Sequence, residues 1–139
     1  EAAALLGALS GRGACVGFVC RMALEKLGTP YAPSSSGPDS FDSSGFLYYV
    51  YGLVGFALPR STQGQGYMTS SRVAREALSR GDFVCFDTEE DDDLSDHVGI
   101  YLGSGQFIHA SDAAGEVVIS SMEEGYYSEV FYWGIRPLQ

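Results

Sequence analysis

The sequence predicts an α+β fold in which N-terminal helices pack on a C-terminal antiparallel sheet of about five strands. Residues 1 to 60 are rich in small and apolar side chains that suit helices, whereas residues 81 to 136 alternate with period two between turn signals. The chain has 139 residues, of which 45% are hydrophobic, enough to bury the core of one ordinary domain. We therefore expect residues 1 to 139 to form a single domain.

The net charge argues against two classes of partner. Eighteen acidic and eight basic side chains give a formal charge of -10, so we expect no binding to nucleic acid or to an anionic bilayer. The sequence contains no apolar stretch long enough for a membrane span. Its apolar start lacks an initiating Met and a basic segment, which favours a helix of a mature or excised domain over an intact signal peptide. We expect a monomer.

The cysteines and the acidic residues do not predict a metal or cofactor. Cys15, Cys20 and Cys85 cannot all pair, and they lack the spacing of zinc ligands. The acidic run 87 to 96 lacks the glycine and the terminal glutamate of an EF-hand, which favours a solvated connection over a calcium site. Because this run leads into His97, it would raise the pKa of that imidazole or favour a substrate with a free ammonium.

The first helix is predicted over residues 16 to 27. Its apolar side chains form one stripe, which would bury Cys20, and Gly28 followed by Pro30 ends the helix. The stripe consists of Val16, Cys20, Ala23, Leu24 and Leu27. The turn formers of residues 34 to 40 then predict a loop.

A second helix is predicted to begin at Ser43, with Asp42 or Ser43 as its N-cap. Its apolar side chains at helical spacing are Phe46, Leu47, Val50 and Val54. Residues 72 to 80 suit a short helix, and Cys85 is expected to face a core. Strands are expected near residues 83 to 86, 97 to 102, 106 to 110, 116 to 120 and 131 to 136, in an order that permits an antiparallel meander.

One predicted hairpin contains the only two histidines of the chain. Gly103-Ser104-Gly105 fits a three-residue loop that pairs Leu102 with Gln106. In that register His97 and His109 point to the same face of the sheet as diagonal neighbours. A two-residue loop would instead separate the two histidines.

Two histidines near a helix N-terminus suit a nucleophile at Ser43. One imidazole would take the proton of the nucleophile, and the other would hold the tautomer of the first. The N–H groups of a helix N-terminus lower the pKa of a thiol and can bind an oxyanion. The alternative is that both histidines fill polar positions of a sheet and that Ser43 only caps a helix. The residues alone leave both interpretations open.

Six segments between residues 16 and 136 occur in an order and spacing typical of one protein family. They are Leu27-Gly28-Thr29-Pro30-Tyr31, Phe41-Asp42-Ser43-Ser44-Gly45-Phe46, Leu58-Pro59-Arg60-Ser61, Gly81-Asp82-Phe83-Val84-Cys85-Phe86, His97-Val98-Gly99-Ile100-Tyr101-Leu102-Gly103 and Phe107-Ile108-His109-Ala110. Together they resemble the NlpC/P60 cell-wall peptidases. The resemblance implies a papain-like fold and cleavage of peptidoglycan stem peptides outside the membrane, often between D-γ-glutamate and the diamino acid.

The resemblance also implies the roles of three catalytic positions. Ser43 occupies the position of the nucleophilic cysteine, His97 that of the base and His109 that of the orienting third residue. A hydroxyl is not ionised near neutrality, and loss of a nucleophile can cost on the order of 10^6 in rate, so we expect the chain as written to be inactive or nearly so.

Three interpretations of Ser43 remain. It is an engineered Cys-to-Ser change, a natural loss that leaves a peptide-binding pseudoenzyme, or the nucleophile of a serine hydrolase. The polar residues around it are intact, which favours the first interpretation.

The resemblance further implies a substrate-binding set. Tyr31 would lie beside the nucleophile, and Asp42 and Ser44 would hold the free amine of an N-terminal L-alanine. The alternatives are a core tyrosine and a helix cap. After Tyr31 the family commonly continues with Trp-Gly-Gly, whereas residues 32 to 35 read Ala-Pro-Ser-Ser, so the edge of the cleft is expected to differ. The implied partners are stem peptides, and the implied location is the cell wall or the extracellular space.

Overall fold

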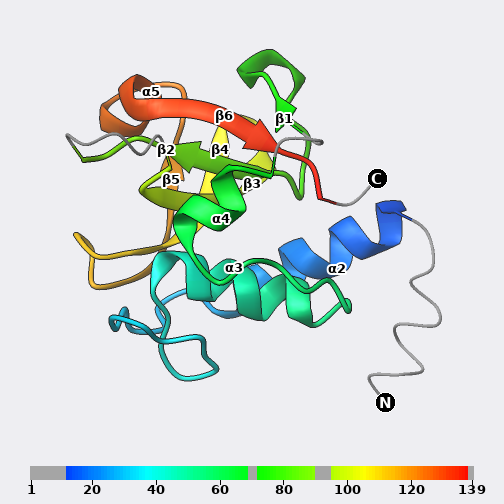
Figure 1. Cartoon of the computed structure of the whole chain (residues 1–139), viewed down its shortest axis with the longest axis vertical. Coiled ribbons are helices and arrows are strands. Elements are labelled where there is room, and N and C mark those ends of the chain that lie inside the picture. The colour runs from blue at the N-terminus through cyan, green and yellow to red at the C-terminus, as the bar shows by residue number, and fades with distance from the viewer. Residues whose placement is uncertain (1–11, 69–71, 90–94, 138–139) are drawn as a thin grey trace.

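The computed structural model describes residues 12–68, 72–89 and 95–137, and it has the predicted α+β fold (Figure 1). Helices near the N-terminus pack on one face of an antiparallel sheet formed by the second half of the chain. The helix expected at the apolar start of the chain lies outside the described residues. Within the described ranges, no helix is both long and apolar enough to cross a membrane.

Helix α2, Arg12–Glu25, starts earlier and stops earlier than predicted. Its buried stripe is narrower than the sequence suggested, because Leu24 and Leu27 are 39% and 45% exposed. Leu27 follows the end of the helix, in a turn closed by Gly28 with a φ of +84°. The buried side chains of this helix include Val16, Val19, Cys20 and Ala23.

Helix α3, Ser43–Gly52, begins at the predicted residue. Asp42 is its N-cap, and its carboxylate accepts a hydrogen bond of 2.6 Å from the N–H of Gly45. This helix packs on α2 and on β3, through fully buried side chains that include Phe46, Leu47, Val50 and Tyr51. The short helix α4, Thr62–Gly66, follows and is capped by Ser61.

The sheet has six strands in the order β1-β6-β2-β3-β4-β5, and every neighbouring pair is antiparallel. The strands are β1 Arg72–Val73, β2 Phe83–Phe86, β3 His97–Gly103, β4 Gln106–Ser111, β5 Glu116–Ser121 and β6 Phe131–Ile135. The short helix expected over residues 72 to 80 is correct only in part, since this segment forms β1 and then the short 3-10 helix η2, Arg75–Ala77.

The continuous meander is also wrong for the last strand. β6 pairs with β2 instead of β5. The nine residues between β5 and β6 include helix α5, Tyr126–Val130, and they carry the chain across the sheet. In its actual position β6 buries Ile135 in the core shared with the helices.

The β3–β4 hairpin has the predicted inner register but a different loop. Tyr101 pairs with Phe107 as expected, whereas Gln106 pairs with Gly103 and not with Leu102. The loop is therefore the two residues Ser104 and Gly105, both with positive φ. A register shift between Tyr101 and Gly103 adds one residue to β3, and this bulge restores the register that keeps the histidines together.

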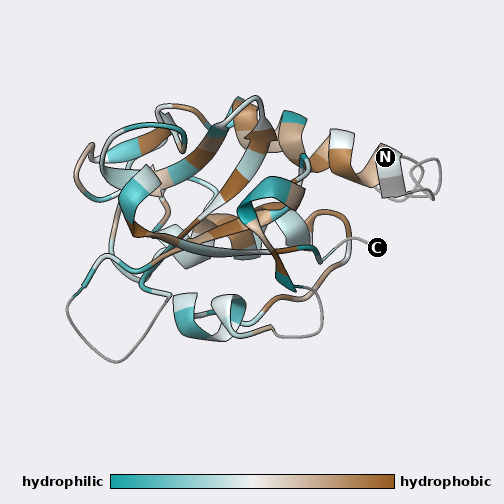
Figure 2. Ribbon diagram, turned by 90° about the horizontal axis from the view of Figure 1, so that it is seen from above, coloured by the Kyte–Doolittle hydropathy of each residue, from teal (hydrophilic) through white to brown (hydrophobic). Residues whose placement is uncertain are grey.

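The sheet has a different apolar cluster on each face. The larger cluster joins α2 and α3 to side chains such as Cys85, Val98 and Ile108, which confirms that Cys85 faces a core. The smaller cluster contains Val84, Phe86, Phe107 and Met122, with residues of α5 packed against it. Figure 2 shows hydrophobic segments of helices and strands meeting in the middle of the molecule.

Candidate active site

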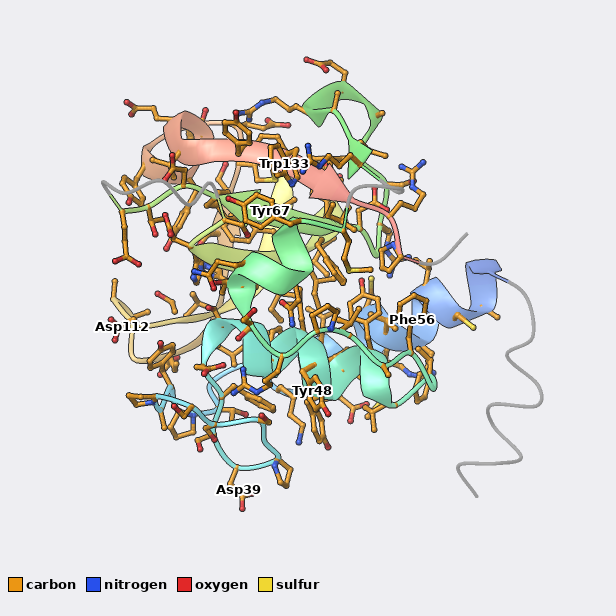
Figure 3. All side chains as sticks on the ribbon, in the orientation of Figure 1. Asp39, Tyr48, Phe56, Tyr67, Asp112 and Trp133 are labelled. Carbon is orange, nitrogen blue, oxygen red and sulfur yellow. The ribbon has the colours of Figure 1, made fainter. Side chains whose placement is uncertain are left out.

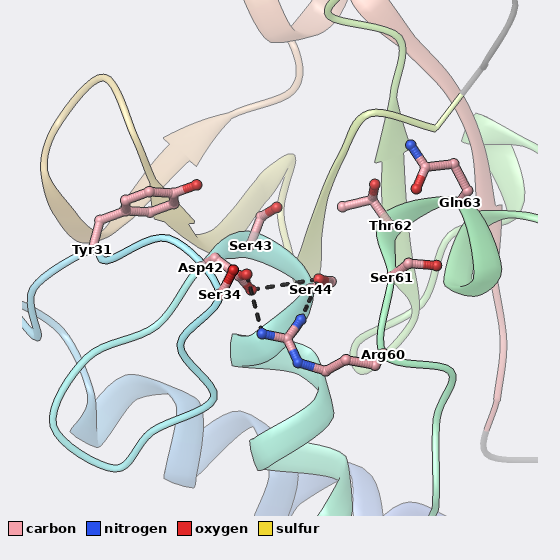
Figure 4. A pocket seen from close by; sticks show the side chains of 9 residues that line it. All are labelled: Tyr31, Ser34, Asp42, Ser43, Ser44, Arg60, Ser61, Thr62 and Gln63. Carbon is pink, nitrogen blue, oxygen red and sulfur yellow. Dashed lines mark hydrogen bonds and ion pairs between the residues drawn. The ribbon is translucent and has the colours of Figure 1, made fainter.

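The site centres on a pocket of about 560 Å³ at the N-terminus of α3 (Figure 4). Three segments line it: the loop before α3, the first turn of α3 and the chain that enters α4. The lining residues are Tyr31, Ser34, Asp42, Ser43, Ser44, Arg60, Ser61, Thr62 and Gln63. The structure therefore brings together four of the residues singled out in the sequence, namely Tyr31, Asp42, Ser43 and Ser44.

Ser43 is the first residue of α3 and is 8% exposed. Figure 4 shows its hydroxyl between the Tyr31 ring and Thr62. Among the described residues, its Oγ atom forms no hydrogen bond. The first N–H groups of a helix have no partner within the helix, so an acyl group at this hydroxyl would meet the positive end of the helix dipole.

Arg60 organises the wall of this pocket. Its Nη1 donates to Ser44 Oγ at 2.7 Å and its Nη2 to Asp42 Oδ2 at 3.1 Å. The same guanidinium also bonds Ser36 Oγ at 2.8 Å and the carbonyl of Ser35 at 3.3 Å. Sequence reasoning gave this arginine no role, although the Leu-Pro-Arg-Ser segment was a signal. Asp42 and Ser44 are thus already hydrogen-bonded, and each keeps acceptor capacity for a ligand.

Buried Gln65 ties α4 to α3 and was also missed. Its amide nitrogen donates to the carbonyls of Ser44 and Pro59 at 3.0 and 2.8 Å. The far end of α4 is held by Trp133, whose indole N–H donates to the carbonyl of Gly66 at 2.6 Å. Figure 3 shows Tyr67 beside Trp133, with ring centroids 6.0 Å apart. These contacts fix the segment that forms one wall of the pocket.

The two histidines lie on neighbouring strands and are joined by a hydrogen bond. Nε2 of His97 and Nδ1 of His109 are 2.7 Å apart, as the predicted register requires. Nε2 of His109 lies 2.9 Å from Oγ of Ser120 on β5. Nothing in the sequence alone pointed to Ser120, because its position opposite the histidine depends on how β5 pairs with β4.

Aromatic rings enclose the histidine pair. The ring of Tyr127 stacks over His97 with centroids 6.0 Å apart, and it meets His109 edge-on at 5.1 Å. Phe107 lies 4.5 Å from His109, and Phe86 lies 6.1 Å from His97. His109 is fully buried as a result.

Burial decides the charge of both imidazoles. It lowers the pKa of His97 to about 4 and the pKa of His109 to about 3, with a further contribution to His109 from the neighbouring ring of His97. The pKa of His97 is thus lowered overall, because desolvation dominates, and a contribution from the acidic run stays a prediction. Residues 90 to 94 of that run lie outside the described residues. Both histidines are neutral near pH 7.

The residues that line the pocket include neither histidine, and the imidazoles contact aromatic rings of the smaller apolar cluster. Helix α3, which begins with Ser43, packs against β3, which begins with His97. In the described parts of the chain no hydrogen bond joins Ser43 Oγ to either imidazole. The described residues also contain no group of three His, Cys, Asp or Glu side chains that could hold a metal ion.

Comparison with known proteins gives one family. Residues 28–136 match the NlpC/P60 family model. The murein DD-endopeptidase MepH of Escherichia coli is 34% identical over 116 residues, which cover 81% of this chain and 42% of MepH. The probable endopeptidase p60 of Listeria welshimeri is 42% identical over 90 residues, which cover 65% of this chain and 16% of that protein. The chain thus matches less than half the length of either relative.

Solved structures agree with these relatives. An NlpC/P60 family protein from Bacillus cereus superposes with a TM-score of 0.82 at 27% identity, over 89% of this chain and 40% of that one. The peptidoglycan hydrolase RipB of Mycobacterium tuberculosis has a TM-score of 0.75 at 27% identity, over 92% of this chain and 67% of that one. The similarity therefore extends over both the helices and the sheet.

Proposed function

Because the chain belongs to the NlpC/P60 family of cysteine peptidases, we propose that its Ser43 pocket binds peptidoglycan stem peptides. With cysteine at position 43, we propose that it hydrolyses them. The observation that carries this proposal is the position of Ser43, at the N-terminus of α3 and on the wall of a pocket of about 560 Å³. We further propose that the domain acts as a monomer at the cell wall.

The proposed chemistry is acyl transfer through a thioester. The thiol of Cys at position 43 would attack the peptide carbonyl and give its proton to Nδ1 of His97. Nδ1 is the nitrogen that would accept it, because Nε2 of His97 is hydrogen-bonded to His109. N–H groups of the first turn of α3 would stabilise the oxyanion. His97 would return the proton to the leaving amine, and water would then release the peptide.

The serine form is expected to be inactive for an electrostatic reason. A thiolate beside His97 would raise the pKa of the imidazole by charge pairing, whereas a neutral hydroxyl cannot. With a pKa of about 4, His97 is too weak a base to ionise a hydroxyl appreciably. We therefore propose that Ser43 replaces the nucleophilic cysteine of an otherwise intact peptidase site.

The proposed scissile bond joins D-γ-glutamate to the diamino acid in a peptide that begins with L-alanine. The carboxylate of Asp42 and the hydroxyl of Ser44 line the pocket beside Ser43 and would accept hydrogen bonds from the free amine. The name of MepH states a DD-endopeptidase, so the test must include both bonds. Peptides with a free and with an acetylated N-terminal alanine, and a DD-crosslinked dimer, separate the possibilities.

A second candidate function is a pseudoenzyme that binds stem peptides without cutting them. It is favoured by one observation, the presence of serine at the position of the nucleophile. The two candidates share a ligand and differ only in the reaction.

The test compares the chain with its Ser43→Cys and Ser43→Ala variants on purified peptidoglycan, with released peptides identified by mass spectrometry. We expect release by Ser43→Cys alone. Adding Cys15→Ser to that variant is the matched control, since Cys15 is only partly buried whereas Cys20 and Cys85 are buried, and activity should persist. An inert Ser43→Cys variant, with muropeptide binding retained, would establish the pseudoenzyme. Loss of both binding and cleavage would leave only the shared fold.

A further inference from the structure

The hydroxyl of Ser120 ends a line of hydrogen bonds that starts at His97. The line runs from Nε2 of His97 to Nδ1 of His109 over 2.7 Å, and from Nε2 of His109 to Oγ of Ser120 over 2.9 Å. Of the four imidazole nitrogens, only Nδ1 of His97 takes no part in this line. The protonation of this nitrogen decides whether His97 can accept a proton from a nucleophile at position 43.

The sheet register places Ser120 where it can act on the pair. Ser120 pairs with Phe107, and Val118 pairs with His109, so the Ser120 side chain shares the face of His109 as its diagonal neighbour. Ser121 is the next residue along the strand and points to the opposite face, where its hydroxyl accepts from the N–H of Glu123.

Two arrangements of the protons are compatible with these two hydrogen bonds. In the first, His97 donates from Nε2 to His109, and His109 donates from Nε2 to Ser120, which leaves Nδ1 of His97 bare. In the second, every bond is reversed: Ser120 donates to His109, His109 donates to His97, and Nδ1 of His97 carries the proton. A hydroxyl can take either end of such a bond. Only the first arrangement lets His97 act as a base.

We propose that Ser120 is a positioning residue whose hydroxyl accepts the hydrogen bond of His109 and thereby keeps Nδ1 of His97 unprotonated. His109 is fully buried, so without an acceptor at position 120 the first arrangement would leave a buried N–H unpaired. Such a group is costly. The pair would then shift toward the second arrangement. The consequence for catalysis rests on the proposed peptidase function, whereas the tautomer assignment does not.

Nitrogen NMR of the full chain tests the assignment directly. The chain has only two histidines, and both are neutral near pH 7, so protonated and bare ring nitrogens can be distinguished without ambiguity. We expect a proton on Nε2 of both rings in the unaltered chain. Ser120→Ala should move both rings toward the Nδ1–H tautomer, while Ser120→Thr and the control Ser121→Ala should leave them unchanged.

An activity measurement completes the test in the Ser43→Cys background. Adding Ser120→Ala should lower kcat/KM roughly 10- to 100-fold, the range that corresponds to one buried unpaired donor. Ser120→Thr should restore most of the loss, and Ser121→Ala should have no effect. Thermal melting of each variant checks that it is folded.

The outcomes separate the two proposals. If the unaltered chain already carries its protons on Nδ1, or if Ser120→Ala leaves the ring nitrogens unchanged, the role of Ser120 is wrong even when Ser43→Cys cuts. If Ser43→Cys is inert while Ser120→Ala shifts the tautomers, the peptidase proposal fails and Ser120 still positions the histidines.

Discussion

Arg60 Nη2 lies 3.1 Å from Asp42 Oδ2, so the N-cap of α3 is also half of an ion pair. The other oxygen of Asp42 accepts from the N–H of Gly45 at 2.6 Å. The carboxylate of Asp42 therefore caps the helix that carries Ser43. It also joins the N-terminus of this helix to the segment before α4. The geometry of the pocket depends on both contacts.

Replacing Arg60 should loosen this arrangement. Arg60→Ala removes four hydrogen bonds made by a side chain that is 37% exposed, and we expect a loss of about 1–2 kcal/mol in the free energy of unfolding. Arg60→Lys should recover little of this free energy, because an ammonium group cannot reproduce the planar set of donors of a guanidinium. Urea denaturation measures the effect. Arg21→Ala, on an exposed part of α2, is the control and should cost less than about 1 kcal/mol.

Two variants of Asp42 should separate capping from ligand recognition. Asp42→Asn keeps an oxygen for the N–H of Gly45, whereas Asp42→Ala does not and should cost about 1 kcal/mol of stability. Both remove the negative charge, so both should lose any preference for stem peptides with a free over an acetylated N-terminal amine. Calorimetric titration with the two peptides measures this. Equal affinity of the unaltered chain for both peptides would contradict the role of Asp42.

Acid should destabilise the protein through its histidines. The pKa values of His97 and His109 are lowered by burial to about 4 and about 3, below the value of about 6.5 in an unfolded chain. Between those limits the unfolded state binds more protons, so stability is fully present above about pH 6.5 and falls as the pH drops toward 4. Urea denaturation at pH 7 and pH 5 should show a smaller loss for His97→Asn than for the unaltered chain.

A thiol at position 43 should change the titration of His97. In the Ser43→Cys variant, charge pairing with a thiolate should raise the pKa of His97 above its value in the serine form. Converting the thiol to a neutral mixed disulfide with methyl methanethiosulfonate should remove the increase. Proton NMR of the imidazoles follows both steps. A titration that is identical in the serine and cysteine forms would mean that position 43 and His97 do not interact.

Tyr127 should keep water from the histidine pair. Its ring lies 5.1 Å from His109 and 6.0 Å from His97, so Tyr127→Ala should hydrate both imidazoles and raise their pKa values toward the ordinary range. Tyr127→Phe retains the ring and should change them little. Tyr126→Ala is a second control, since Tyr126 is 55% exposed. The same NMR titration reads out all three variants.

Much of the fold could be predicted because it follows from local patterns in the sequence. The cap at Asp42, the apolar spacing after Ser43 and the alternation of the strands are features of neighbouring residues. The place of β6 beside β2 could not be predicted, because the pairing of distant strands depends on how each fills the core. The loop of the histidine hairpin was missed by one residue, since a bulge replaced the third loop position.

The sequence by itself determined the family, the helix that begins at Ser43 and the register that joins His97 to His109. Each of these follows from motif order or from spacing along one stretch of chain. Only the tertiary structure decided the roles of Arg60 and Ser120 and the low pKa values of the histidines. Hydrogen bonds between distant segments and burial beneath α5 exist only once the chain has folded, and no local pattern encodes them.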